Sequence, residues 1–340
     1  MERVKRTVLK LVLLAGLTAI IGGNLIVVAS AGGTIGLGFP LECTLGVNCF
    51  VQNYVDHDPS GGYRDFHCGA MTYDGHDGTD FRLPSMDVER AGIAVLAAAD
   101  GVVKRIRDGV PDALLTSAAK GDVASAECGN GVVIDHADGW QTQYCHMRQG
   151  SIIAIPGRSI KRGTPLGLVG LSGATEFPHL HLTVRHNGEV VDPLAPTLPP
   201  SACSDRPKDT LFDDRNQNYD YRNRIVLNFG FADGPVLPDA IEAGGLKERE
   251  PDHTSTALVA YVRLMGLEAG DVQTFAIIGP DGEPIVKRSF DALDKPKAQN
   301  SIYIGWKRPK EGWKEGNYSA IYSITNGNEM KLNKWFFLKI

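Results

Sequence analysis

Two histidines separated by one residue stand in an apolar segment of the chain, Phe177-Pro-His-Leu-His-Leu-Thr-Val184. In a β-strand, successive side chains point to opposite faces. His179, His181 and Thr183 would therefore share one face of a strand, and the aliphatic residues between them would share the other. A single histidine in a protein core is usually just hydrogen-bonded. Two adjacent imidazoles on one face need a common explanation, and a metal ion supplies the most economical one.

A second segment supplies the remaining ligands of such a site. His76-Asp-Gly-Thr-Asp80 places an imidazole and a carboxylate four residues apart, and Gly78 between them permits a tight backbone bend. One histidine and one aspartate from this segment, together with one histidine from the apolar strand, make three ligands of N, N and O type. A fourth position then stays open for water, which is typical of catalytic rather than structural zinc.

These motifs resemble those of the lysostaphin-like zinc endopeptidases, which cut peptide bonds in bacterial cell-wall peptidoglycan. His76-x-x-x-Asp80, Tyr144-Cys-His-Met147 and His179-Leu-His181 follow one another in the order of that family, and the resemblance covers about residues 65–195. The chain departs from the family at Met147, where a leucine is usual, and in a long segment that interrupts two core strands.

The resemblance implies that His76, Asp80 and His181 bind Zn²⁺, and it assigns His146 and His179 to an unligated polar pair beside the metal. Zinc lowers the pKa of its bound water to about 7, which supplies a nucleophile at neutral pH. No glutamate base stands in these motifs. A histidine is therefore expected to accept the proton, to orient the water or to stabilise the oxyanion, and the sequence leaves the division between His146 and His179 open.

Length and composition set the broader frame. The chain has 340 residues, of which 43% are hydrophobic, and its length suggests about two globular domains. The formal charge of −5 is modest and gives no indication of nucleic-acid binding. Walker, Gly-x-Ser-x-Gly, His-Glu-x-x-His and dinucleotide-binding signatures are all absent from the sequence.

The predicted fold class is all-β. Short β-type runs between residues 89 and 194 predict a compact antiparallel domain, similar to a duplicated hybrid motif, with its site in a groove. We assign residues 32–200 to this zinc endopeptidase domain and residues 201–222 to a linker that follows the proline-rich stretch 193–200. Residues 223–340 contain seven short alternating segments, which predict an immunoglobulin-like β-sandwich with an accessory role.

The first 31 residues have the pattern of a secretory signal. A basic start is followed by an apolar run and by Ala29-Ser-Ala31, a cleavage-site sequence. A retained membrane anchor is the alternative, because the apolar run is long. The polar break at Gly22-Gly-Asn24 favours cleavage, which leaves no stable membrane span. The protein is then expected in the periplasm or outside the cell.

Six cysteines, all beyond the predicted cleavage point, suit an oxidising compartment. Six cysteines allow 15 pairings, so spacing alone does not decide between them. Cys43 and Cys49 are near enough to close a small loop, and Cys128 and Cys145 flank a predicted hairpin. Cys68 and Cys203 remain. A nucleophilic role for Cys145 beside His146 is disfavoured, because neighbours in a strand face opposite ways.

The sequence thus predicts a secreted zinc endopeptidase that acts on peptidoglycan peptides, with a possible wall or protein partner for the C-terminal domain. A catalytically silent regulator or wall-binding protein on the same fold is the alternative, although such proteins usually lack some ligands and this chain retains all five residues. The segment from Arg107 to Cys128 is predicted to be an inserted loop that forms a mobile wall of the groove.

Overall fold

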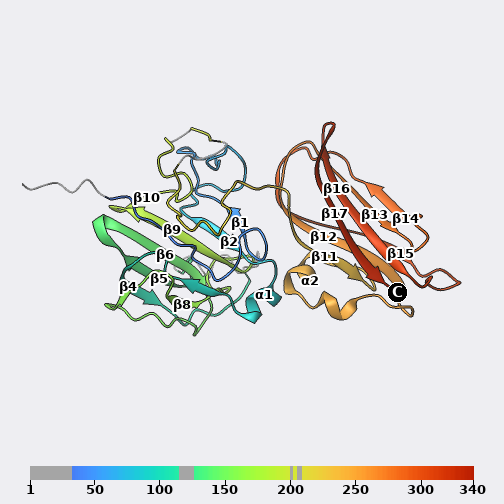
Figure 1. The fold of residues 1–340 in the computed structure, drawn as a ribbon, viewed down its shortest axis with the longest axis horizontal. Coiled ribbons are helices and arrows are strands. Elements are labelled where there is room, and N and C mark those ends of the chain that lie inside the picture. The colour runs from blue at the N-terminus through green and yellow to red at the C-terminus, as the bar shows by residue number, and fades with distance from the viewer. Residues whose placement is uncertain (1–32, 115–125, 200–201, 205–208) are drawn as a thin grey trace, which may run out of the picture. The chain divides into compact units, whose positions relative to one another are not determined.

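The structure is a computed structural model, and it describes residues 33–114, 126–199, 202–204 and 209–340. The predicted signal segment and the middle of the Arg107–Cys128 insertion lie outside these ranges. Residues Thr34–Ile340 form one compact unit. Most of the regular secondary structure in the described chain is antiparallel strand, which confirms the all-β prediction (Figure 1).

The largest sheet, formed by strands between residues 50 and 190, places the apolar His-Leu-His strand near its centre. That strand, β9 (His179–His186), lies between β2 (Thr79–Arg82) and β6 (Trp140–Met147). The sheet continues outward through β1 (Phe50–Asn53) on one side, and through β5 (Asn130–Asp135), β4 (Gly101–Arg107) and β7 (Ser159–Ile160) on the other, while β10 (Glu189–Val190) pairs with β9. A separate two-stranded sheet joins β3 (Ala94–Leu96) and β8 (Pro165–Leu168).

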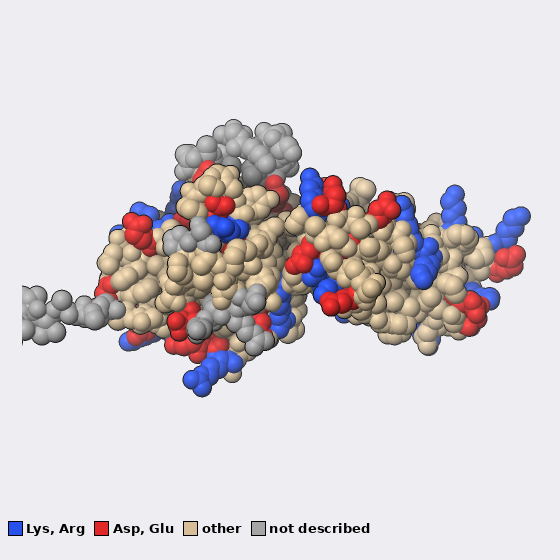
Figure 2. All heavy atoms as spheres, turned by 90° about the horizontal axis from the view of Figure 1, so that it is seen from above, with Lys and Arg blue, Asp and Glu red and all other residues tan. Residues whose placement is uncertain are grey.

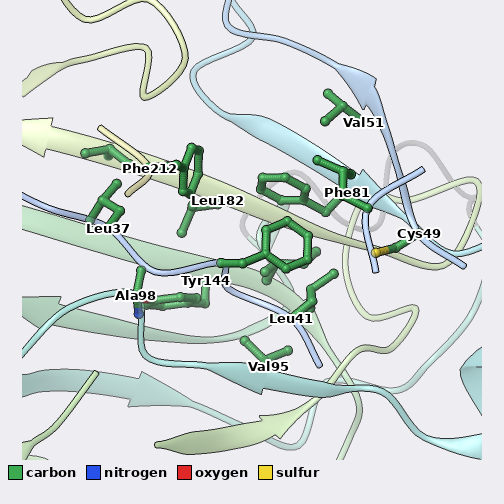
Figure 3. Close-up of a cluster of buried hydrophobic side chains, with 14 of the residues drawn as sticks. Leu37, Leu41, Cys49, Val51, Phe81, Val95, Ala98, Tyr144, Leu182 and Phe212 are labelled. Carbon is green, nitrogen blue, oxygen red and sulfur yellow. The ribbon is translucent and has the colours of Figure 1, made fainter. Parts of the chain in front are cut away.

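The side chains of β9 point alternately to the two faces of the sheet, as the sequence predicts. Leu180 and Leu182 are fully buried in the main hydrophobic core, against Phe81 of β2 and Tyr144 of β6. Figure 3 shows Leu182, Phe81 and Tyr144 within one cluster that also includes Phe212. Burial of such side chains contributes roughly 1.5–3 kcal/mol each to folding. The core thus fixes β9, and the histidines on its other face are held in place with it.

In the part of the chain that the structure describes, helices are few and short. They are α1 (Met86–Ala91), α2 (Pro238–Ala243) and the 3₁₀ turns η1 (Ala137–Gly139) and η2 (Leu246–Arg249). α1 ends at Gly92, whose φ of 88° lies in the left-handed region that glycine accepts without strain. Within the described ranges, none of these helices is long and apolar enough to span a bilayer.

Residues from 225 onward form two facing sheets with a hydrophobic core of their own. One sheet contains β11 (Ile225–Ala232), β12 (Ala257–Leu267) and β15 (Lys297–Lys307). The other has the order β14 (Pro284–Ser289), β13 (Asp271–Ile278), β16 (Asn317–Asn326) and β17 (Glu329–Lys339). Each of the seven predicted segments is a strand, and their division into three and four strands matches an immunoglobulin-like sandwich.

Three disulfides join all six cysteines, as Cys43–Cys49, Cys68–Cys203 and Cys128–Cys145. The hairpin of β5 and β6 turns at η1, where Asp138 and Gly139 both have positive φ. Because Cys145 is held in a disulfide, it is structural, as predicted, and not a nucleophile.

On the face shown in Figure 2, positive and negative side chains are interspersed.

Candidate metal and catalytic site

His76, Asp80 and His181 form a group whose ligand atoms all lie within 4.8 Å of one another. Asp80 of β2 and His181 of β9 are direct partners in the strand register, and His76 lies in the turn before β2. All three residues are at most 9% exposed. The sheet thus brings together residues that are more than a hundred positions apart in the chain.

Hydrogen bonds on the far side of two rings determine which nitrogen faces the group. His76 Nδ1 lies 2.6 Å from the carbonyl oxygen of Tyr54, which can only accept, so Nδ1 donates and Nε2 is left bare. His181 Nε2 lies 3.1 Å from Asp77 Oδ1 and 3.0 Å from Thr183 Oγ1, so it is the donor and Nδ1 faces the group.

The three inward atoms are all acceptors when both rings are neutral. His76 Nε2 and His181 Nδ1 are 3.1 Å apart, and they lie 3.2 and 2.9 Å from Asp80 Oδ1. Three converging lone pairs can be satisfied by a bound metal ion or, without one, by a proton on His181 that is shared with Asp80. Ligands about 2.0–2.2 Å from a tetrahedral zinc ion stand roughly 3.3 Å apart. The donor set therefore fits a small divalent metal ion.

The electrostatics of the group agree with its geometry. Burial opposes the charged form of His181, but hydrogen bonds and charges from Asp77 and Asp80 prevail and raise its pKa to about 9. Burial also opposes the charged form of Asp80. Electrostatic interactions with His76 and His179 and the close contacts of the His181 and His76 rings nevertheless hold the pKa of Asp80 well below the usual value. The carboxylate is ionised and favours a positive charge beside it.

His146 and His179 face the same small volume without joining the ligand group. Their ring centroids are 4.5 Å apart, and His179 Nε2 lies 3.5 Å from Asp80 Oδ1. His179 Nδ1 donates to the carbonyl of Phe177 at 2.9 Å, and His146 Nδ1 donates to the carbonyl of Ser172 at 2.8 Å. Each ring therefore directs a bare Nε2 inward. Burial is the main cause that lowers the pKa of both rings, so they are neutral at pH 7.

His146 reaches this position through an uncommon backbone conformation. Its φ of 60° lies in the left-handed region, which costs a residue other than glycine of order 1 kcal/mol or more. Its backbone N–H donates to the carbonyl of Cys128, and its ring is held by Ser172. These two bonds keep the His146 side chain inside the site. Its neighbour Cys145 is also buried, in a disulfide.

Several supporting residues were not identified from the sequence. Asn53 of β1 donates to Asp80 Oδ2 at 2.8 Å, which orients the carboxylate. Asp77 holds both His181 and Arg185, the latter at 2.7 Å. Such partners fix the ring orientation of metal-binding histidines. The sequence could have indicated Asp77, which lies inside the His76–Asp80 motif, and Thr183, which lies on the predicted histidine face of the strand. It gave no indication of Asn53.

Gly78 is needed for space and not for a bend. Its φ is not positive, so the turn at this point does not demand glycine. A Cβ atom at Gly78 would lie 2.6 Å from His181 Nε2 and 2.8 Å from the carbonyl of Leu182, both far inside contact distance. The prediction that Gly78 permits a tight backbone bend is therefore wrong. The residue is needed because it allows β9 to approach closely.

Gly78→Ala should weaken metal binding without unfolding the protein. The methyl group displaces His181 from the bond to Asp77, and loss of such support typically costs ten- to a hundred-fold in metal affinity. Competition against a chelating dye measures this change. Gly61→Ala is the matched control, because a Cβ there meets nothing within 4 Å. Equal affinities of the two variants would show that the contact at Gly78 is unimportant.

A buried charge cluster lies next to the site along β2. Arg82, two residues after Asp80 and fully buried, pairs with Glu242 of α2, and Glu242 also pairs with Arg263 of β12. The Arg82 guanidinium lies 4.4 Å from the centre of the Phe177 ring, and that ring contacts His179 with centroids 4.7 Å apart. Arg82 thus supports the end of β9 that carries His179.

The described start of the insertion is firmly attached beside the site. Asp112 accepts hydrogen bonds from the backbone N–H groups of Gln149 and Leu171, at 2.9 and 2.8 Å. Leu171 precedes Ser172, whose carbonyl holds His146. Asp108 accepts in the same way from Gly150. These bonds fix the point from which residues 115–125 leave, and that segment itself lies outside the described residues.

The part of the chain that carries the candidate site matches a known protein family. Residues 74–193 match the model of Peptidase family M23, and they contain all five residues around the site. This part of the chain is a domain of Peptidase family M23.

Individual relatives agree with that assignment. The chain is 33% identical over 138 residues to the DD-carboxypeptidase/endopeptidase Mpg of Neisseria meningitidis serogroup B, a match that covers 41% of this chain and 26% of the relative. It is 34% identical to the cell division protein DipM of Caulobacter vibrioides, over 36% of this chain and 17% of the relative. It is 30% identical to the peptidoglycan DD-endopeptidase ShyA of Vibrio cholerae, over 36% and 23%.

These matches are partial. The chain spans about a quarter or less of the length of these relatives. Among solved structures, a zinc-containing peptidase from Vibrio cholerae is 26% identical and aligns over 42% of this chain and 38% of that one. Its TM-score of 0.27 is too low to support an argument from the superposition.

Proposed function

We propose that this protein is a secreted zinc-dependent endopeptidase that hydrolyses peptide bonds in bacterial peptidoglycan. The observation that carries the proposal is the convergence of His76 Nε2, His181 Nδ1 and Asp80 Oδ1 within 3.2 Å of one another, a buried group that can hold a metal ion. The N, N and O donor set suits zinc. The family match adds the reaction class, and relatives named as peptidoglycan endopeptidases suggest the substrate.

His76, Asp80 and His181 would hold the metal, which supplies Lewis-acid activation of water and of the scissile carbonyl. His146 and His179 would manage the protons. Each presents an unprotonated Nε2 to the site, held there by a carbonyl on its Nδ1. A neutral, buried imidazole can accept the proton of the attacking water, and the second ring can donate to the oxyanion or to the leaving amine.

The proposed substrate is a stem peptide or cross-bridge of the wall, and a periplasmic or extracellular location follows from it. The names of two relatives described above, Mpg and ShyA, specify D,D bonds, so D,D-cross-linked wall is the first substrate to test. The described ranges hold no helix that could span a membrane. A silent binding or regulatory role is less favoured, because all five site residues are present and converge.

The purified full-length chain should contain close to one zinc per molecule by elemental analysis. Digestion of peptidoglycans with different cross-links, followed by mass spectrometry, should reveal new peptide termini from one bond type. Treatment with a chelator should abolish the products, and added zinc should restore them. A protein that binds zinc but releases no termini from any wall would favour the silent alternative, and one that binds no metal would contradict the proposal altogether.

A further inference from the structure

We propose that one end of the C-terminal sandwich is a saccharide-binding site that takes a single pyranose unit of a glycan chain. The site is a cavity of about 320 Å³ formed entirely by residues of the sandwich. Its walls come from the turn between β13 and β14, the end of β15 and the loop before β16. This volume lies at the lower end of the range for small-molecule sites and is too small for a folded partner.

The opening is marked by an aromatic ring that the strand register directs inward. Ile302 and Ile304 of β15 face the sandwich core, and Trp306 follows on the same side of the strand. An inward-facing tryptophan is normally covered, but Trp306 is 50% exposed. The indole lines the cavity and leaves about half of its surface open to solvent.

Two deeper rings form a fixed wall. Trp313 is 9% exposed, and its Nε1–H donates to the carbonyl of Ser255 at 2.7 Å. Tyr318 is buried edge-on to Trp313, with centroids 6.3 Å apart, and its hydroxyl donates to the carbonyl of Lys314 at 2.9 Å. Because both rings are packed into the sandwich core and their polar atoms are bonded to backbone, they form a rigid wall that exposes only a small part of Trp313, and the open aromatic surface comes from Trp306.

Charged groups of both signs surround the aromatic wall. Lys314 Nζ donates to Asp281 Oδ2 at 2.6 Å, and Glu311 also lines the cavity. All three side chains are exposed. A pyranose ring has an apolar face of C–H bonds and a rim of hydroxyls that both donate and accept. Aromatic faces beside close carboxylates and an ammonium group match this pattern better than they match an apolar peptide or an anion.

The binding site itself is independent of the metal centre. Identifying its natural ligand with the glycan strand of peptidoglycan rests on the proposed function, because that polymer carries peptides and pyranoses side by side. In that case the sandwich holds the sugar chain while the peptidase domain acts on the attached peptide.

Peptide-free oligosaccharides test the proposal, because a peptidase cannot cut them. The full chain is titrated with a tetramer of β-1,4-linked N-acetylglucosamine, with a β-1,4-linked glucose tetramer and with a ten-residue polyproline peptide, by calorimetry and by tryptophan fluorescence. We expect at least one saccharide to bind, and Trp306→Ala to weaken that binding at least tenfold. Trp335→Ala should leave it unchanged, because Trp335 is 49% exposed but lies on β17, outside the cavity lining.

Three results would overturn the inference: no saccharide binding at millimolar concentration, saccharide binding that Trp306→Ala does not change, or binding of polyproline alone. Circular dichroism confirms that both variants are folded, and Asp281→Ala gives a second, exposed position that should weaken saccharide binding. Cleavage of soluble cross-linked peptides is assayed separately. Failure of that cleavage with intact saccharide binding would reject the proposed peptidase and leave this site standing.

Discussion

His179→Ala protein should keep its zinc and lose catalysis, whereas His181→Ala protein should lose both. Removal of His181 leaves two protein ligands, which hold zinc poorly, and activity should fall to background with the metal. Removal of His179 or His146 leaves all three ligands. Their loss as proton-transfer groups should lower turnover by about a hundred-fold or more, even at saturating zinc.

Measurement of zinc content and of cleavage rate on the same samples separates these outcomes. Loss of a neighbouring group can weaken metal binding roughly ten- to a hundred-fold, so rates must be compared at saturating zinc. His186→Ala serves as the control, because His186 also lies on β9 but stacks on Trp140, away from the ligand group. Full recovery of His179→Ala activity by added zinc would assign His179 to metal support and leave His146 as the catalytic residue.

The second large effect concerns stability. Glu242→Ala should lower the free energy of unfolding by about 3–5 kcal/mol, because it leaves Arg82 and Arg263 buried without their shared carboxylate. Burial already lowers the pKa of Arg82 to about 9, in part offset by Glu242, so its charge is costly where it stands. Urea unfolding measures the change.

Glu329→Ala is the matched control for that experiment. Glu329 also pairs with a cation, Lys331, but its side chain is 74% exposed, and such pairs contribute at most about 1 kcal/mol. Similar destabilisation by the two substitutions would mean that the Arg82 cluster is solvated or re-paired. Replacing Glu242, Arg82 and Arg263 together by apolar residues should recover much of the loss.

Much of this architecture could be predicted because the informative patterns are local. Alternation along β9 identified which residues face the site and which face the core, and the seven sandwich strands follow from the same period of two. The ligand set required the family resemblance as well. Spacing alone did not distinguish His181 from His179, since both leave the same face of one strand.

The remaining features depend on contacts that no local pattern carries. The carbonyls of Tyr54 and Ser172 decide which nitrogen of His76 and His146 faces the site, yet a backbone carbonyl has no sequence signature. Glu242 lies in a six-residue helix with ordinary surface composition, and only the fold shows that it is buried. Gly78 was noticed, but its neighbour in space, β9, lies a hundred residues further along the chain.

The order of strands in the main sheet also determines how late in synthesis the site can form. Among the described strands, β2 pairs with β1 and β9 alone, and His76 is made 105 positions before His181. At translation rates of roughly 5–20 residues per second, that interval lasts roughly 5 to 20 seconds. Throughout it the nascent chain carries two of the three proposed ligands, and the edge of β2 that pairs with β9 stays unpaired. The proposed metal group can therefore form only after the strand that completes this part of the sheet has been made.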